Sequence, residues 1–216
     1  MTYDKNGVKD FFQRRVSKFD SFYEENKPGI WKLLDCLFRS SMRKRFVRAL
    51  KVVGCLGSPT VLDIGCGPGR YAAAIVKSCN AKVFGIDFSP AMLKEAKAAV
   101  RRCGREGRCR FLCADFLEYP FKEKFDATLA IGFFDYIKSP LAQLKKIRAL
   151  TLQKAIMSFP SRWHLRNIIR KIRLSFLGCP VYFYDRRQIE ALLKQAGFDK
   201  FRIENLDRDY FVVCEI

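Results

Sequence analysis

The spacing of hydrophobic residues divides the chain into two parts. Residues 8–52 carry aromatic and apolar side chains at helical intervals, with a Pro-Gly break between them, and this pattern predicts two or three helices. From Thr60 onward, short apolar runs alternate with amphipathic stretches, which is typical of a mainly parallel sheet with helices on both faces. We therefore expect one α/β domain, in which residues 1–57 form an N-terminal helical cap and residues 58–216 form the core.

The core pattern predicts seven strands, four helices and one insert. The expected strands are residues 60–64, 81–87, 109–115, 125–134 with its exit loop, 154–159, 200–205 and 210–216. The expected helices are residues 70–78, 91–103, 141–151 and 185–198, and a basic helical insert at about 161–177 follows the fifth strand. Ser89 with Pro90 marks the start of the second helix, and Asp185 and Gly197 mark the ends of the last.

Polar and glycine residues follow the first four predicted strands. In an open parallel sheet, ligands bind in the crevice beyond the carboxyl ends of the strands, where the topology reverses. This rule selects the run Asp63–Gly69, then Asp87, Asp115 and the run Gly132–Tyr136. We expect these residues to form a ligand site at one edge of the sheet.

The glycines of the first loop favour close approach of the backbone to a ligand. Gly65, Gly67 and Gly69 allow a tight turn where a side chain would collide. The phosphate-binding fingerprint of dinucleotide enzymes needs its third glycine at position 70, which is Arg70 here. The loop therefore argues against a nicotinamide or flavin enzyme.

Four segments in order resemble the motifs of class I (Rossmann-like) S-adenosylmethionine-dependent methyltransferases of the small-molecule type. They are VLDIGCGPGR, VFGIDFSPAMLKEA, CADF and FDATLAIGFFDYI. The resemblance is strong from residue 60 to about residue 137 and looser through SFP and FYDRRQIEALLKQAGF. It implies a Rossmann-like fold, S-adenosyl-L-methionine as cofactor and S-adenosyl-L-homocysteine as product.

The carboxylates have separate expected roles in holding this cofactor. Asp87 can accept hydrogen bonds from both ribose hydroxyls, and Asp63 with the backbone of the glycine loop would hold the methionine end. The resemblance assigns Asp115 to the adenine amino group, although it would alternatively cap the next helix. Residues expected to contact the cofactor are Tyr23, Asp63, Gly65, Cys66, Gly67, Gly69, Asp87, Phe88, Met92, Asp115, Phe116, Gly132 and Phe133.

Catalysis of methyl transfer needs positioning more than acid chemistry, because the sulfonium leaves as a neutral thioether. An acceptor that must lose a proton needs a base, and His164 is the single histidine of the chain. Asp135 and Tyr136 are the reserve candidates, and the alternative for His164 is a place on the surface of the basic helix.

An aromatic pocket is expected beside the methyl group. Phe133, Phe134 and Tyr136, with Tyr23 from the cap, are its candidates, and core packing is the alternative for each. The segment GFFDYI lacks the N/D-P-P-Y/F signature carried by enzymes that methylate base amino groups in nucleic acids. That absence argues against this chemistry.

The strong positive charge of the chain predicts an anionic partner. Lysine and arginine number 41 against 22 acidic residues, and they gather in residues 43–51, 101–110 and 162–173. Nine cysteines without a CxxC pair indicate reduced thiols, and no metal site is expected. The first residues lack a secretory signal, so we expect a cytoplasmic protein that has peripheral contact with an anionic membrane through its basic helix.

Three functions are consistent with these patterns. The first is methylation of an oxygen, less favourably a nitrogen, of a small anionic or amphipathic acceptor, including lipid-like ones. The second is methylation of RNA, favoured by the charge; DNA is not an expected partner. The third is a non-catalytic protein that binds the cofactor or a membrane surface.

Overall fold

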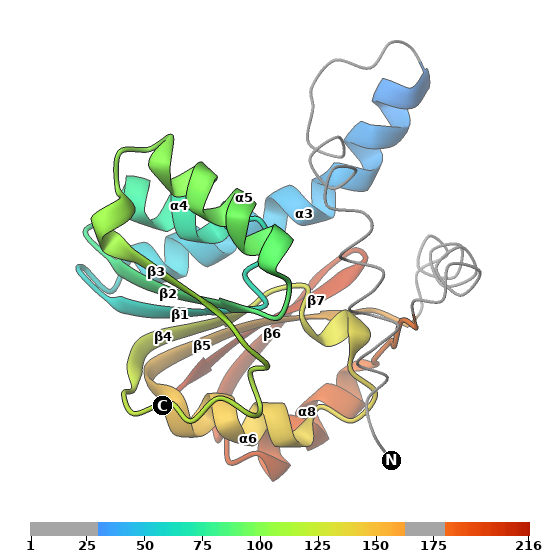
Figure 1. The fold of residues 1–216 in the computed structure, drawn as a ribbon. Helices are drawn as coiled ribbons and strands as arrows, with labels where there is room; N and C mark the ends of the chain where they lie inside the picture. The colour runs from blue at the N-terminus through green and yellow to red at the C-terminus, as the bar shows by residue number, and fades with distance from the viewer. Residues whose placement is uncertain (1–29, 163–179) are drawn as a thin grey trace.

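A computed structural model describes residues 30–162 and 180–216, with side chains described from residue 42 onward in the first helix (Figure 1). The strands are β1 (Thr60–Ile64), β2 (Lys82–Asp87), β3 (Cys109–Cys113), β4 (Phe125–Ala130), β5 (Thr151–Pro160), β6 (Lys200–Leu206) and β7 (Asp209–Glu215). The helices are α3 (Ile30–Gly54), α4 (Arg70–Ser78), α5 (Pro90–Arg101), α6 (Leu141–Leu150) and α8 (Arg186–Gln195). Two 3₁₀ turns are η1 (Glu106–Arg108) and η2 (Phe134–Tyr136).

The seven strands form one sheet in the order β3-β2-β1-β4-β5-β7-β6. Every neighbouring pair is parallel except the two pairs made by β7, which is antiparallel to both β5 and β6. The predicted seven-stranded, mainly parallel Rossmann-like sheet is therefore confirmed. The strand order reverses between β1 and β4, so the carboxyl ends of these strands border the crevice where such sheets bind ligands.

Helices cover both faces of this sheet, as Figure 1 shows. Helices α3, α4 and α5 lie on one face, where residues such as Val53, Ile75 and Val100 form one apolar cluster with the sheet. Helices α6 and α8 lie on the other face, where Leu144 and Ile189 belong to the larger cluster. Burial of these apolar stripes stabilises the layers, because a strand with both faces covered is removed from water on each side.

Local signals set the helix ends that the sequence predicts. The hydroxyl of Ser89 accepts a hydrogen bond from the backbone of Met92 at 3.4 Å, and Pro90 is the first residue of α5. Asp185 and Gln188 form a reciprocal capping box at the start of α8. The helix stops before Gly197, whose φ of 84° is left-handed.

The N-terminal cap and the basic insert are described only in part. Helix α3 confirms a helix after the Pro-Gly break, while residues 1–29 lie outside the described residues. Of the expected insert at 161–177, only residues 161 and 162 are described. Within the described part of the chain, no helix has the length and apolar character needed to cross a membrane.

Candidate cofactor and acceptor site

The loop after β1 folds back over the end of β2. The backbone N–H groups of Gly65 and Cys66 both donate to the carbonyl of Ile86, at 2.8 and 3.2 Å. Gly69 then donates to the carbonyl of Cys66 at 3.0 Å and begins α4. These bonds fix the loop at the carboxyl edge of the sheet, where the sequence predicts a ligand.

Glycine is suited to positions 69 and 67 of this loop for different structural reasons. A Cβ on Gly69 would lie 2.8 Å from the Cα of Ala96, so this glycine permits the close packing of α4 against α5. Gly67, with φ at 51°, has no atom within 4 Å of the place where its Cβ would be. Its backbone therefore borders open space beside the loop, as a ligand contact requires.

Asp87 ties the glycine loop to the end of β2. One carboxylate oxygen accepts from the N–H of Gly67 at 2.9 Å, and the other accepts from the N–H of Ser89 at 2.9 Å. Burial raises the pKa of this carboxyl, and the backbone hydrogen bonds partly offset the rise. Each oxygen keeps further lone pairs, so Asp87 remains able to accept from ligand hydroxyls.

Asp63 is a buried carboxylate with an unsatisfied oxygen. Its residue is 3% exposed, and among the described residues its Oδ2 atom has no hydrogen-bond partner. Burial, and next the charge of Asp87, raise the pKa of Asp63 to about 7. A buried carboxylate without a partner is costly, so this position suits a ligand that carries a positive charge or N–H donors.

The loop after β3 gives Asp115 a local role. Its carboxylate accepts from the N–H of Leu117 at 2.8 Å, and its carbonyl accepts from Tyr119 at 3.0 Å. These bonds close a turn, because residues 114–124 contain no helix. The expected helix cap is therefore wrong, because Asp115 closes a turn where no helix follows. The contact with adenine stays a prediction.

Aromatic residues of the two loops divide between the core and the crevice. Phe134 is fully buried and stacks on Phe159 with ring centroids 4.5 Å apart, so core packing is its role. Phe116 is 5% exposed and meets Phe133 edge-on at 6.0 Å, which leaves little of its ring for adenine. Phe133 and Tyr136 are half-buried and remain candidates for the crevice.

Some of the other residues predicted to contact the cofactor are buried in the core. Cys66 is buried, and burial raises the pKa of its thiol well above the ordinary range, so this residue offers its backbone to a ligand. Met92 is buried in the first turn of α5, and Phe88 is half-buried after Asp87. Tyr23 and His164 lie outside the described residues.

The loop after β4 is held by a serine that sequence reasoning missed. The hydroxyl of Ser158, buried on β5, accepts from the N–H of Gly132 at 2.8 Å and from Arg45 of α3 at 3.2 Å. Gly132, with φ at 73°, also has no atom within 4 Å of its Cβ position. The signal for Ser158 was a single polar residue in the apolar run AIMSF.

The η2 turn connects the crevice to a second hollow. Asp135 is buried in this turn, and its carbonyl accepts from the N–H of Tyr182 at 2.9 Å. The hydroxyl of Tyr184 donates to the carbonyl of Ile137, and burial raises the pKa of this phenol. Both tyrosines belong to a segment that the sequence pattern did not assign to the site.

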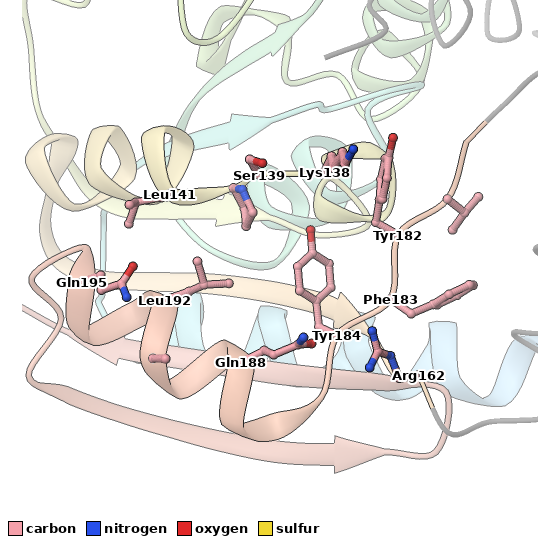
Figure 2. Close-up of a pocket in the computed structure, with 13 residues that line it drawn as sticks. Lys138, Ser139, Leu141, Arg162, Tyr182, Phe183, Tyr184, Gln188, Leu192 and Gln195 are labelled. Atoms are coloured by element: carbon pink, nitrogen blue, oxygen red, sulfur yellow. The ribbon is translucent and has the colours of Figure 1, made fainter. Parts of the chain in front are cut away.

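This hollow is a pocket of about 910 Å³. Figure 2 shows residues 138–141 along its upper side, α8 below and the segment 181–184 along the right side. Lys138 and Arg162 bring two cations to its lining, beside the rings of Tyr182, Phe183 and Tyr184. The lining therefore combines positive charge with aromatic surface.

Comparisons with known proteins show similarity to methyltransferases in sequence and in fold. Residues 61–153 match the family model described as a methyltransferase domain. The tRNA U34 carboxymethyltransferase of Shewanella denitrificans is 30% identical over 115 residues, which are 53% of this chain and 34% of that protein. The 24-methylenesterol C-methyltransferase 2 of Oryza sativa is 35% identical over 72 residues, 33% of this chain and 20% of that protein. The chain thus spans about a third or less of the length of these relatives.

Solved structures agree on the fold. Magnesium protoporphyrin IX methyltransferase from Synechocystis with bound S-adenosylhomocysteine superposes with a TM-score of 0.79 at 18% identity, covering 98% of this chain and 99% of that one. An N-methyltransferase from Bradyrhizobium japonicum with the same ligand gives a TM-score of 0.67 at 13% identity, covering 97% and 98%. The described sheet therefore has the fold of these class I, Rossmann-like methyltransferase structures.

Proposed function

We propose that this chain is an S-adenosylmethionine-dependent methyltransferase that transfers a methyl group to an oxygen of a small, anionic acceptor. The acceptor binds in the pocket between residues 138–141, residues 181–184 and α8. The observation that carries the acceptor class is the pair of cations, Lys138 and Arg162, in a lining of aromatic rings. Nitrogen is the less favoured receiving atom.

The crevice residues fit the cofactor. A buried oxygen of Asp63 without a partner suits the ammonium group of the methionine end, and the open backbone at Gly67 admits the same chain. Asp87 keeps lone pairs for the ribose hydroxyls. When bound, S-adenosylmethionine supplies an electrophilic methyl group on sulfur.

The pocket fits an acidic acceptor with an apolar body. A volume of about 910 Å³ lies within the usual range for small-molecule sites. Lys138 and Arg162 would neutralise and orient a carboxylate, while Tyr182 and Tyr184 would pack against the rest of the molecule. A similar solved structure is named for a small-molecule acceptor, magnesium protoporphyrin IX, which supports this class.

An acceptor with an ionised carboxylate does not have to be deprotonated by the enzyme. Its oxygen carries no proton at neutral pH, so the chain needs to position and partly dehydrate it without a base. Under this proposal His164, Asp135 and Tyr136 are dispensable as bases. A hydroxyl acceptor would instead require one of them.

The test is methyl transfer from labelled S-adenosylmethionine to aromatic carboxylic acids, with their methyl esters as neutral counterparts. We expect methylation of the acids alone. Lys138→Gln and Arg162→Gln should each raise KM about tenfold, which is about 1.4 kcal/mol of lost binding. The control is Lys145→Gln, an exposed lysine of α6 outside the pocket lining. Equal rates on acids and esters, or unchanged KM in both pocket variants, would reject the acceptor class.

The cofactor assignment is tested separately by calorimetry with S-adenosylhomocysteine. Asp87→Ala should weaken binding about a hundredfold, because charge-assisted hydrogen bonds to the ribose are lost. Thermal unfolding of the same variant reports whether the glycine loop still folds. A folded variant with unchanged affinity contradicts the placement of the ribose.

RNA is the second candidate acceptor. The observation in its favour is the match of 115 residues to tRNA U34 carboxymethyltransferases. The same labelled assay with total RNA decides between the two classes. Label in RNA and none in the carboxylic acids would show that RNA is the acceptor and would reject the small acidic one.

A further inference from the structure

The end of α5 and the start of β3 form a surface rich in cations. We define the α5–β3 basic edge as Lys77, Lys82, Lys94, Lys97, Arg101, Arg102, Arg105, Arg108 and Arg110. Between residues 77 and 110 the sequence holds three acidic residues, of which Asp87 belongs to the crevice. β3 is an edge strand of the sheet, so this surface lies at one side of the molecule.

The fold leaves the charge of this edge largely uncompensated. Its one ion pair among the described residues joins Arg101 to Glu106 at 3.8 Å, with the arginine side chain 81% exposed. Lys97, Arg102 and Arg105 are exposed and make no ion pair with any described residue. Like charges held close together in this way repel each other, and an anionic partner would relieve the repulsion.

A groove leads from this edge toward the glycine loop. It lies between α4 and α5, which run side by side in Figure 1, and has a volume of about 370 Å³. Lys77 and Arg102 line one end, and Arg70 and Pro68 line the other. The floor consists of small residues, among them Ala73 and Ala99, so the depression is bordered by cations and is not blocked by bulky side chains.

The composition of the edge distinguishes a nucleic acid from a membrane. Interfacial binding needs apolar side chains that enter the lipid layer. The described residues include four large exposed hydrophobics, Val47, Leu117, Leu152 and Ile216, and none of them belongs to this edge. Five of the nine cations are arginines, whose planar guanidinium groups pair with phosphate through two hydrogen bonds.

We propose that the α5–β3 basic edge, with the groove between α4 and α5, binds the phosphate backbone of a single-stranded nucleic acid. The binding is electrostatic and independent of base sequence, because cations and a groove that tracks the strand supply it. The α4 and α5 part of this surface lies on the face of the sheet opposite α6 and α8, which border the acceptor pocket, whereas Arg110 lies over the ring of Phe84 on the other face. The groove is therefore a docking surface outside the acceptor pocket.

The test measures binding of labelled oligouridylate to the full chain over a series of salt concentrations. The variant combines Lys97→Gln, Arg102→Gln and Arg105→Gln. Its matched control removes the same charges elsewhere, through Lys145→Gln, Arg187→Gln and Arg202→Gln, which are all exposed. S-adenosylhomocysteine binding should be unchanged in both, which verifies that each variant is folded.

We expect the edge variant to bind oligouridylate at least about tenfold more weakly at low salt, with its log–log salt slope reduced by about 2, since each lost phosphate contact contributes about 0.7. The control should lose less than about threefold. Equal losses in the two variants would show that net charge alone attracts the strand, and would overturn the proposal. Binding of phosphatidylserine vesicles without binding of oligouridylate would overturn it as well.

Discussion

Residues 43–51 and residues 101–110 are both runs of arginine and lysine, yet the fold uses them differently. The first run lies on α3, and three of its cations reach acidic residues of the β6–β7 hairpin. The second run ends α5 and enters β3, and its one ion pair within the described part of the chain is a long contact between exposed groups. The ion pairs of the first run hold α3 against the sheet, whereas the second run leaves its charge at the surface.

The pairs of α3 show how that fastening works. Lys44 and Arg48 pair with Asp207 and Glu204 at 2.9 and 2.8 Å while exposed to solvent. Arg45 is different, because its pair with Asp209 is nearly buried, with side chains 11% and 8% exposed. Arg45 also donates to Ser158, which holds Gly132 of the crevice, so α3 is linked to the candidate site.

Removal of Arg45 should have the largest effect on stability. Arg45→Met leaves the carboxylate of Asp209 buried without this cation, and we expect a loss of about 3–5 kcal/mol in the free energy of unfolding. Adding Asp209→Leu should recover most of it, because an apolar pair carries no desolvation cost. Urea denaturation measures both. A loss below about 1 kcal/mol in the single variant would mean that the pair does not fasten α3.

Asp63 is also a buried carboxylate, but unlike Asp209 it has no cation partner among the residues that the structure describes. Its pKa, about 7 in the folded chain, exceeds the ordinary value near 4 of an unfolded chain, so the folded state holds the proton more tightly. This group therefore stabilises the fold at low pH, and the contribution is lost as pH rises from about 4 to about 7, at up to about 1.4 kcal/mol per pH unit.

Asp63→Asn should remove this slope from the free energy of unfolding, measured in urea at several pH values. The difference between variant and parent should grow in favour of the variant up to about pH 7 and then level off. S-adenosylhomocysteine should bind the parent more tightly as pH rises through 7, and the variant weakly throughout. Parallel stability profiles for the two proteins would contradict the assignment.

The exposed pairs of α3 should have smaller effects. Lys44→Gln and Arg48→Gln should each cost about 0.2–1 kcal/mol, because solvent screens pairs of this kind. The loss should shrink at high salt, as thermal unfolding with and without added sodium chloride would measure. A loss that salt does not alter would indicate packing by the side-chain stems instead.

The smallest effect on stability belongs to the α5–β3 basic edge. The triple variant Lys97→Gln, Arg102→Gln and Arg105→Gln should change the free energy of unfolding by no more than about 0.5 kcal/mol, since these side chains have no partner among the described residues. Loss of nucleic-acid binding without loss of stability would sharpen the comparison. Marked destabilisation would make both basic runs structural.

Much of the candidate site was predictable because its signals are local. Glycines in the loop after β1, the acidic ends of β1 and β2, and the start of α5 at Ser89 are encoded by neighbouring residues. The roles of aromatic residues were not predictable in this way. Phe133 and Phe134 are adjacent, yet one is half-buried beside the crevice and the other is fully buried against Phe159.

The seven strands and the glycine loop were predictable from local patterns in the sequence, because backbone preferences and hydrophobic periodicity act over a few residues. The fold was needed to show that Lys44 meets Asp207, 163 positions away, and that Lys138 and Arg162 line the same pocket. The physical reason is that ion pairs and pockets depend on which surfaces the strand order brings together. Two basic runs that look alike in the sequence thus differ in whether the fold supplies acidic partners.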